Sequence, residues 1–135
     1  MIADRAVVDA SVLVRAGVED TTSARDWLES VESGRTEALA PEILWLEVAS
    51  VLRRYVASAA MSRSHAGSVL RRMLALPIHI YSHQALAEPA LDRALGRGLS
   101  VYDASYLALA EVAHAVVITA DRRLAEAAEQ AELVV

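Results

Sequence analysis

The sequence SVYDASYLALAEVAHAVVITAD, residues 100–121, combines a helical pattern, a buried strand and two acidic residues. Ser100 is a typical N-cap residue, and the apolar residues after it have the spacing of one helix face. VVIT at 116–119 is apolar on both faces, as expected for a buried parallel strand. Parallel neighbouring strands need a crossover between them, and a helix that leads into such a strand is typical of one. This stretch therefore predicts an α/β fold with a mainly parallel sheet.

The rest of the chain continues the alternation of strands and helices. Strands are expected at 2–8, 36–40, 77–81, 116–119 and 132–135. Helices are expected from Thr22 or Ser23 to Ser33, from Pro41 to 57, from Ser62 to Ala75, from Ser100 onward, and from Asp121 to Ala131. Pro89 is expected to divide residues 82–97 into a turn and a short helix. The length predicts a single domain that spans residues 1–135.

Composition narrows the class of protein. Hydrophobic residues make up 55% of the chain and charged residues 23%, which is typical of a soluble globular protein. The absence of cysteine excludes disulfides and thiolate metal sites and favours the cytoplasm. A net charge of −5 without any lysine argues against a protein that coats nucleic acid regardless of sequence. No apolar run approaches the roughly 18 residues of a membrane span, so no membrane contact is expected.

Two acidic residues follow predicted strands. Asp9 comes directly after the first strand, and Asp121 lies two residues beyond the strand at 116–119. Open parallel sheets bind ligands beyond the carboxyl ends of their strands, near the point where strand order reverses. If these two strands are neighbours at the centre of the sheet, the two carboxylates share one crevice.

Two more acidic residues lie on the inward faces of predicted helices. Glu47 is three residues from Leu44 and four from Val51, at the edge of an apolar stripe. Asp103 shares a helix face with Tyr106 by the same spacing. Both carboxylates are therefore expected to point toward protein.

Each acidic residue also has a purely structural interpretation. Asp103 and Asp121 could cap helices, Asp9 could serve a turn, and Glu47 could pair with Arg54. Taken together, the four acidic residues are harder to explain in this way. Two carboxylates about 4 Å apart repel each other by roughly 4 kcal/mol at an effective dielectric constant near 20. In a chain without lysine, the simplest counter-charge is an oxygen-preferring divalent cation, Mg²⁺ or Mn²⁺.

Four blocks of the sequence resemble the PIN domain family, in particular the VapC-type ribonuclease toxins of prokaryotic toxin–antitoxin modules. In chain order the blocks are VVDASVLV, PEILWLEVASVL, LSVYDASYLALA and ITADRRLAEAA. The resemblance implies a three-layer α/β/α sandwich with a five-stranded parallel sheet. It also implies a Mg²⁺- or Mn²⁺-dependent endoribonuclease, the toxin of a type II system, that hydrolyses RNA, forms a homodimer and has a cognate VapB-type antitoxin.

The same blocks assign the family's functional residues to positions of this chain. The catalytic and metal-binding acids correspond to Asp9, Glu47, Asp103 and Asp121. The family's hydroxyl positions appear as Ser11 and Thr119, which could orient carboxylates or hydrogen-bond metal-bound water. Arg122 and Arg123 are candidate RNA contacts because they follow Asp121 at a helix start. Glu47 could either bind the ion or take the proton of the attacking water.

Other classes of protein fit the sequence less well. A receiver domain or a haloacid-dehalogenase-like phosphatase would need a lysine, and the phosphatase would need an acid where Ser11 stands. An integrin-type adhesion module would need a second serine where Leu13 stands. The strongest alternative is a non-catalytic PIN-like module that binds metal and partners. Trp27, Trp45 and Leu46 are candidate partner contacts, with burial in the core as the alternative.

Overall fold

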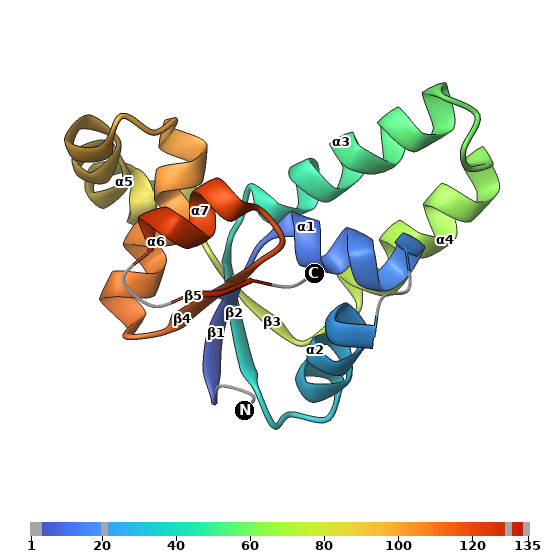
Figure 1. The fold of residues 1–135 in the computed structure, drawn as a ribbon, viewed down its shortest axis with the longest axis horizontal. Coiled ribbons are helices and arrows are strands. Elements are labelled where there is room, and N and C mark those ends of the chain that lie inside the picture. Colours follow the sequence, from blue (N-terminus) through green and yellow to red (C-terminus); the bar gives the residue numbers. More distant parts are fainter. Residues whose placement is uncertain (1–3, 20–21, 129–130, 134–135) are drawn as a thin grey trace.

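A central sheet with helices on both faces makes up the fold (Figure 1). The computed structural model describes residues 4–19, 22–128 and 131–133. Its elements are β1 (Arg5–Val8), α1 (Ala10–Val14), η1 (Arg15–Glu19), α2 (Thr22–Glu32), β2 (Glu37–Pro41), α3 (Leu44–Ala57), α4 (Arg63–Leu74), β3 (Ile78–Tyr81), α5 (His83–Arg97), α6 (Val101–Ala113), β4 (Val116–Thr119), α7 (Arg122–Ala127) and β5 (Ala131–Leu133).

The sheet has five parallel strands in the order β3-β2-β1-β4-β5. In the central strand β1, Ala6 pairs with Ala38 of β2 on one side and with Val116 of β4 on the other. The chain builds outward from β1 to β2 and β3 and then returns to place β4 on the opposite side of β1. The strand order therefore reverses between β1 and β4, where open α/β sheets characteristically bind ligands.

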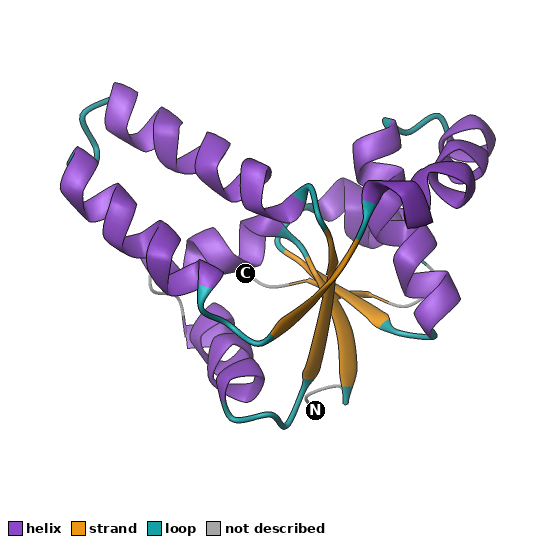
Figure 2. Cartoon of the chain, turned by 180° about the vertical axis from the view of Figure 1, so that it is seen from behind, coloured by secondary structure: helices purple, strands orange, loops and turns teal. Residues whose placement is uncertain are grey.

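Alternate strand residues contribute to two hydrophobic cores on opposite faces of the sheet. Ala6, Val8 and Ile118 belong to a core that also contains side chains of α1 to α4. Val7 and Val117 belong to a second core with side chains of α5, α6 and α7. Figure 2 shows the sheet between these two groups of helices. The predicted three-layer sandwich with a parallel sheet is confirmed.

Several helix boundaries lie where the sequence predicts them. Ser62 and Ser100 are N-caps whose side-chain oxygens accept backbone N–H groups three residues later. Gly34 follows α2 with a φ of +81°, and Gly98 ends α5 with a φ of +63°. A residue without a Cβ adopts these left-handed conformations without steric cost.

The predicted helix start at Pro41 is wrong. Pro41 ends β2, where it pairs with Tyr81 of β3, and α3 begins at Leu44. Proline lacks an N–H group and suits the end of a strand ladder. The next residue, Glu42, donates its N–H to the Tyr81 carbonyl at 2.9 Å.

The predicted division of residues 82–97 at Pro89 is also wrong, because α5 runs without interruption from His83 to Arg97. Proline inside a helix frees the carbonyl four residues earlier, which here belongs to Ala85. Ala85 is exposed, so water can bind that carbonyl. The Ser82 side chain caps the helix start and accepts the Ala85 N–H at 3.1 Å.

A helix that the sequence pattern does not reveal follows β1. It consists of α1 and the π-helical turn η1, and Asp9 is its N-cap. Val12, Leu13 and Val14 are consecutive and all buried, so this short helix lacks the periodicity of a half-exposed helix.

Helix α7 is shorter than predicted, and β5 begins one residue before the strand predicted at 132–135. Helix α7 ends at Ala127 rather than Ala131, because Ala128 is extended with φ −81° and ψ 145°. Positions 2–3, 129–130 and 134–135 of the predicted elements lie outside the described residues. Over the described ranges, no helix is long and apolar enough to cross a membrane.

Candidate active site

Asp9 lies at the carboxyl edge of the sheet, between β1 and β4. The Thr119 hydroxyl at the end of β4 donates to Asp9 Oδ2 at 2.6 Å. The N–H and hydroxyl of Ser11 both donate to Oδ1, at 3.0 and 2.5 Å. Only 7% of Asp9 is exposed, and Thr119 is fully buried. The structure thus brings Asp9, Ser11 and Thr119 together, and the two hydroxyls orient the Asp9 carboxylate.

The environment of Asp9 resists its negative charge. Burial raises the pKa of the Asp9 carboxyl, while hydrogen bonds from Ser11, Thr119 and the Val12 backbone lower it, and burial prevails. An ionised Asp9 would consequently gain from a nearby cation.

Glu47 reaches the same region from α3. The Tyr106 hydroxyl of α6 donates to Glu47 Oε1 at 2.7 Å. Tyr106 is only 2% exposed, so the donor of this bond is buried, while Glu47 is partly exposed. Throughout the described residues no ion pair joins Glu47 to Arg54, and this structural alternative therefore fails.

The pKa shifts of Glu47 and Tyr106 identify the acidic side chains that act on them. Burial raises the pKa of Glu47, and the carboxylates of Asp9 and Asp103 raise it further, against the hydrogen bond from Tyr106. Burial also raises the pKa of Tyr106, as do Glu47, Asp9 and Asp103. The phenol therefore keeps its proton and acts as a donor. Asp9 and Asp103 both lie near enough to Glu47 and Tyr106 to act on their charges.

Asp103 is more open than Asp9. Its backbone N–H donates to Ser100 Oγ at 3.1 Å, so the cap uses the Ser100 side chain rather than the Asp103 carboxylate. The Asp103 side chain is 35% exposed, and its Oδ2 lies 3.8 Å from Arg123 Nη2. An ion pair this open contributes little to stability.

Asp121 lies at the margin of the site. Its Oδ1 accepts the Arg123 N–H at 2.9 Å and caps α7, as the structural interpretation predicts. Its own N–H donates to Thr119 Oγ1 at 2.9 Å, and Thr119 in turn donates to Asp9. Asp121 is thus linked to the buried carboxylate through one hydroxyl. The neighbouring Arg122 is exposed.

The donor set suits a hard divalent cation. In residues 4–19, 22–128 and 131–133, no three acidic or histidine side chains already have the spacing of a metal site. Within the same ranges, no arginine or histidine forms a salt bridge to Asp9 or Glu47. Partly buried carboxylate oxygens without a cationic partner are the ligands that Mg²⁺ and Mn²⁺ prefer.

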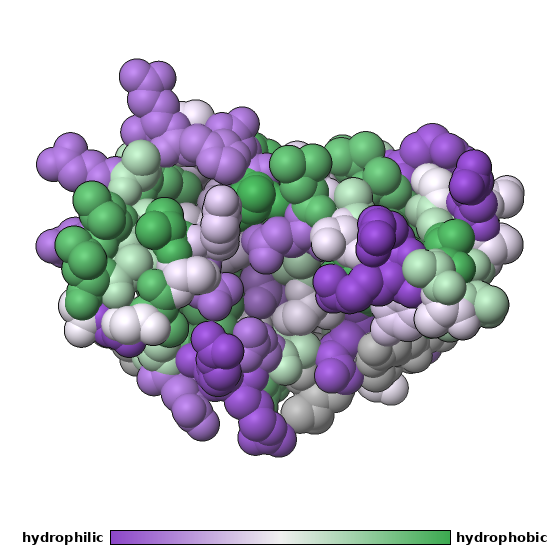
Figure 3. Space-filling model, turned by 90° about the horizontal axis from the view of Figure 1, so that it is seen from above, coloured by the Kyte–Doolittle hydropathy of each residue, from purple (hydrophilic) through white to green (hydrophobic). Residues whose placement is uncertain are grey.

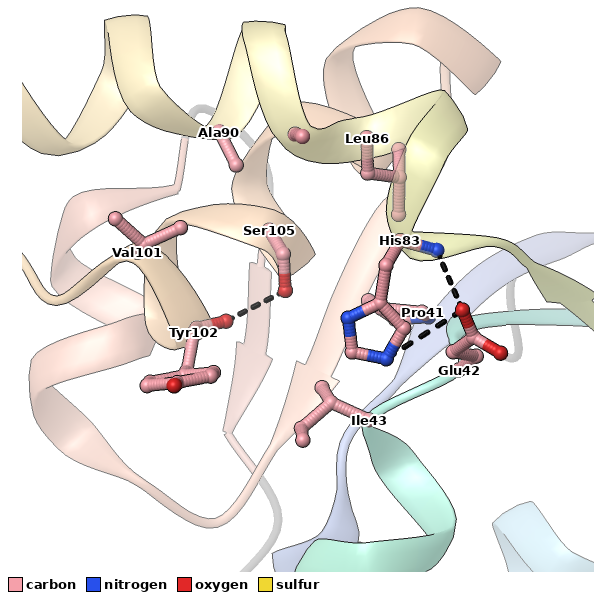
Figure 4. Close-up of a pocket in the computed structure, with 10 residues that line it drawn as sticks. Pro41, Glu42, Ile43, His83, Leu86, Ala90, Val101, Tyr102 and Ser105 are labelled. Atoms are coloured by element: carbon pink, nitrogen blue, oxygen red, sulfur yellow. Dashed lines mark hydrogen bonds and ion pairs between the residues drawn. The ribbon is translucent and has the colours of Figure 1, made fainter.

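A hydrophobic pocket occupies the other side of the first turn of α6 (Figure 4). Tyr102 and Ser105 line it from α6, His83 lines it from α5, and Ile43 lines it from the turn before α3. Glu42 Oε1 accepts the His83 N–H at 2.7 Å at its edge. This mainly apolar lining suits a planar or apolar group rather than a cation.

The sequence matches the family model described as PIN domain over residues 6–130. The chain belongs to the PIN domain family. A curated relative, Ribonuclease VapC3 of Pyrobaculum aerophilum, is 32% identical over 124 residues, which cover 89% of this chain and 92% of the relative. The resemblance found in the four sequence blocks is thereby confirmed.

Two solved structures share the fold of this PIN domain. A crystal structure of a Pyrobaculum aerophilum protein has a TM-score of 0.75 at 24% identity and covers 94% of this chain and 81% of its own. A toxin–antitoxin complex from Klebsiella pneumoniae has a TM-score of 0.68 at 20% identity and covers 94% and 95%.

Sequence reasoning missed Tyr106 as a residue of the PIN site. It follows Asp103 by three residues on the same helix face, which was the only available signal. Nothing in the sequence pairs it with Glu47, because the two residues are 59 positions apart.

The three candidate partner contacts have different environments in this PIN domain. Trp27 is 4% exposed and belongs to the core, so the burial alternative holds for it. Trp45 is partly buried against the same core. Leu46 is 68% exposed on α3 and remains available to a partner.

Proposed function

We propose that this PIN domain is a divalent-metal-dependent endoribonuclease and the toxin of a type II toxin–antitoxin pair. The observation that carries the proposal is the buried Asp9 carboxylate, oriented by two hydroxyls at the switch point of the sheet and facing Glu47 and Asp103. The similarity to Ribonuclease VapC3 supports RNA as the substrate.

Asp9, Glu47 and Asp103 would hold Mg²⁺ or Mn²⁺, with Asp121 at the rim. A divalent cation bound there would activate water and neutralise charge that develops on the phosphate. Asp9 and Glu47 would gain most from this counter-charge, because burial opposes the ionisation of both and the neighbouring carboxylates also oppose that of Glu47. No three acidic side chains of the described residues have the spacing of a metal site, so cation binding would require these carboxylates to come closer together.

The remaining roles follow from the positions of the side chains. The raised pKa of Glu47 makes its carboxylate a suitable acceptor for the proton of the attacking water. Ser11 and Thr119 hold Asp9 in one orientation. Arg122 and Arg123 lie at the N-terminal end of α7 and would bind phosphates of the RNA strand. The products would carry a 5′-phosphate and a 3′-hydroxyl.

A groove between α3 and α4 supports an antitoxin as partner. These helices form a hairpin that extends away from the sheet (Figure 1). The groove is mainly apolar, with two arginines, which suits an apolar segment that carries acidic residues. Its lining consists of Ala49, Leu52, Arg53, Val56, Ala57, Arg63, Ala66, Gly67 and Leu70. The Klebsiella pneumoniae structure with the same fold is a toxin–antitoxin complex, which agrees with such a partner.

An apolar surface on α5 and α6 supports a homodimer. Leu91 is 51% exposed, Leu95 78% and Val112 64%. Figure 3, which looks onto the carboxyl ends of the strands, shows hydrophobic side chains gathered at the α5 end of the molecule. Large apolar side chains at this exposure are typical of a surface that a second copy covers.

Cleavage of structured RNA by the purified protein tests the proposal. We expect cleavage in Mn²⁺ or Mg²⁺, none in chelator, and 5′-phosphate ends when the products are mapped. Asp9→Asn serves as the inactive control. Metal binding without cleavage would support the non-catalytic PIN-like module instead, and full activity in chelator would refute the metal scheme.

A further inference from the structure

We propose that Tyr106 is a positioning residue that fixes the Glu47 carboxylate for cation binding and catalysis. This inference rests on the proposed function and assigns a role within the same site. It concerns a side chain that touches neither substrate nor cation and acts only through Glu47.

The contact between the two residues joins separate layers of the fold. Tyr106 lies on α6 and Glu47 on α3, and the phenol donates to Oε1 at 2.7 Å. Helix α6 packs on one face of the sheet, and α3 packs on the other. The hydrogen bond therefore spans the carboxyl edge of the sheet, where Asp9 lies.

The ring and the hydroxyl of Tyr106 have different partners. The ring is buried in the core with Leu107, Leu109 and Val117, and a phenylalanine ring would fill the same space. The hydroxyl instead contacts a carboxylate that burial and two neighbouring carboxylates already destabilise. A hydrogen bond donated to a charged group favours that charged form. The hydroxyl thus serves Glu47, and the ring serves the fold.

The position of Tyr106 on α6 links it to a second acidic residue. Asp103 and Tyr106 are three residues apart and lie on one helix face. A single rigid helix therefore presents one carboxylate and fixes another. Glutamate has several rotatable side-chain bonds, so a fixed Oε1 removes conformations that would carry the carboxylate away from Asp9 and Asp103.

Tyr106→Phe tests this role because it removes only the hydroxyl. Tyr81→Phe is the matched control, since Tyr81 packs at the edge of the same core. Removal of a partner that orients a metal ligand typically lowers affinity or activity about 10- to 100-fold. We expect such a loss in Mn²⁺ affinity by titration calorimetry and in kcat, with little change in KM for RNA. Tyr81→Phe should match the wild type in all three.

A double variant separates positioning from a general structural effect. If Tyr106 acts through Glu47, then Tyr106→Phe added to Glu47→Gln lowers Mn²⁺ affinity and kcat no further. Full additivity of the two changes would overturn the inference. Should Tyr106→Phe fail to fold, a crystal structure of the wild-type protein with Mn²⁺ decides instead. The Tyr106 hydroxyl should still donate to the Glu47 carboxylate, and a Glu47 that binds the ion without this contact would overturn the inference.

The outcomes also distinguish this inference from the proposed function. If Tyr106→Phe and the wild-type protein cleave RNA at the same rate and bind Mn²⁺ with the same affinity, only the positioning role is refuted. If the wild-type protein binds Mn²⁺ but leaves RNA intact, the proposed function is refuted. The Mn²⁺ affinities of the variants then still test the role of Tyr106.

Discussion

The stretches VVDASVL, residues 7–13, and VYDASYL, residues 101–107, are nearly alike in sequence but have different roles in the fold. Asp9 follows a strand, caps a helix and is 7% exposed, with both carboxylate oxygens hydrogen-bonded. Asp103 lies inside the first turn of a helix, and its side chain is 35% exposed. The position of an acidic residue relative to the sheet edge, rather than its local sequence, therefore decides how firmly its side chain is held.

Both acidic residues should matter equally for cleavage, which is the largest expected effect. Asp9→Asn and Asp103→Asn each remove one negative ligand, and we expect RNA cleavage in Mn²⁺ to fall at least about 100-fold in each. Asp92→Asn, an exposed acid on α5, is the matched control and should keep full activity. Wild-type activity in either variant would show that the substituted carboxylate is not needed for cleavage.

The same two positions should differ in stability. Asp9→Ala leaves the Ser11 and Thr119 hydroxyls without their acceptor and removes the cap of α1, at a cost of about 2 kcal/mol. Asp103→Ala should change the free energy of unfolding by less than about 0.5 kcal/mol. Urea unfolding in chelator measures both. Equal losses would mean that exposure does not separate the two acidic residues.

Thr119→Val tests Asp9 separately, because it alters the surroundings of Asp9 and leaves those of Asp103 intact. The variant keeps the shape of the buried side chain but removes a donor to Asp9 and an acceptor for the Asp121 N–H. We expect a loss of about 1 kcal/mol in unfolding free energy. Cleavage should weaken while Asp9 is still present. An unchanged urea midpoint would show that the hydroxyl does not support Asp9.

Glu47 should cause a small pH dependence of the free energy of unfolding of the metal-free protein. Burial and neighbouring carboxylates raise the pKa of Glu47 above its ordinary value of 4.5. The folded state therefore binds a proton that the unfolded state has lost, and stability falls as pH rises from 4.5 through the folded pKa. Urea midpoints measured in chelator across this range should fall less steeply for Glu47→Gln. Identical slopes would contradict the raised pKa.

The fold was largely predictable from the sequence, because its main signals are local. The strand at 116–119 was predicted with its observed bounds, since a strand apolar on both faces must lie inside a sheet. Ser62 and Ser100 marked helix starts, since their side chains satisfy N–H groups within the same turn. The helix break predicted at Pro89 was wrong, because the carbonyl that Pro89 frees belongs to an exposed residue. Helix α1 was not predicted, because it is short and its consecutive residues Val12, Leu13 and Val14 are all buried, which hides the helical period.

The site was predictable only where it depends on topology. The meeting of Asp9 with Thr119 follows from adjacent parallel strands, which the pattern of strands and crossovers indicates. The hydrogen bond between Tyr106 and Glu47 depends on how two helices on opposite faces approach the sheet edge. No spacing within the chain records that approach, so this contact required the structure.

Anomalous diffraction from a crystal soaked in Mn²⁺ shows whether Asp9, Glu47 and Asp103 hold a cation together. We expect one or two peaks at the carboxyl edge of the sheet, within about 2.0 to 2.3 Å of carboxylate oxygens from these three residues. The peaks should vanish in Asp9→Asn. A soaked crystal that diffracts well but has no peak among these three side chains would contradict this expectation.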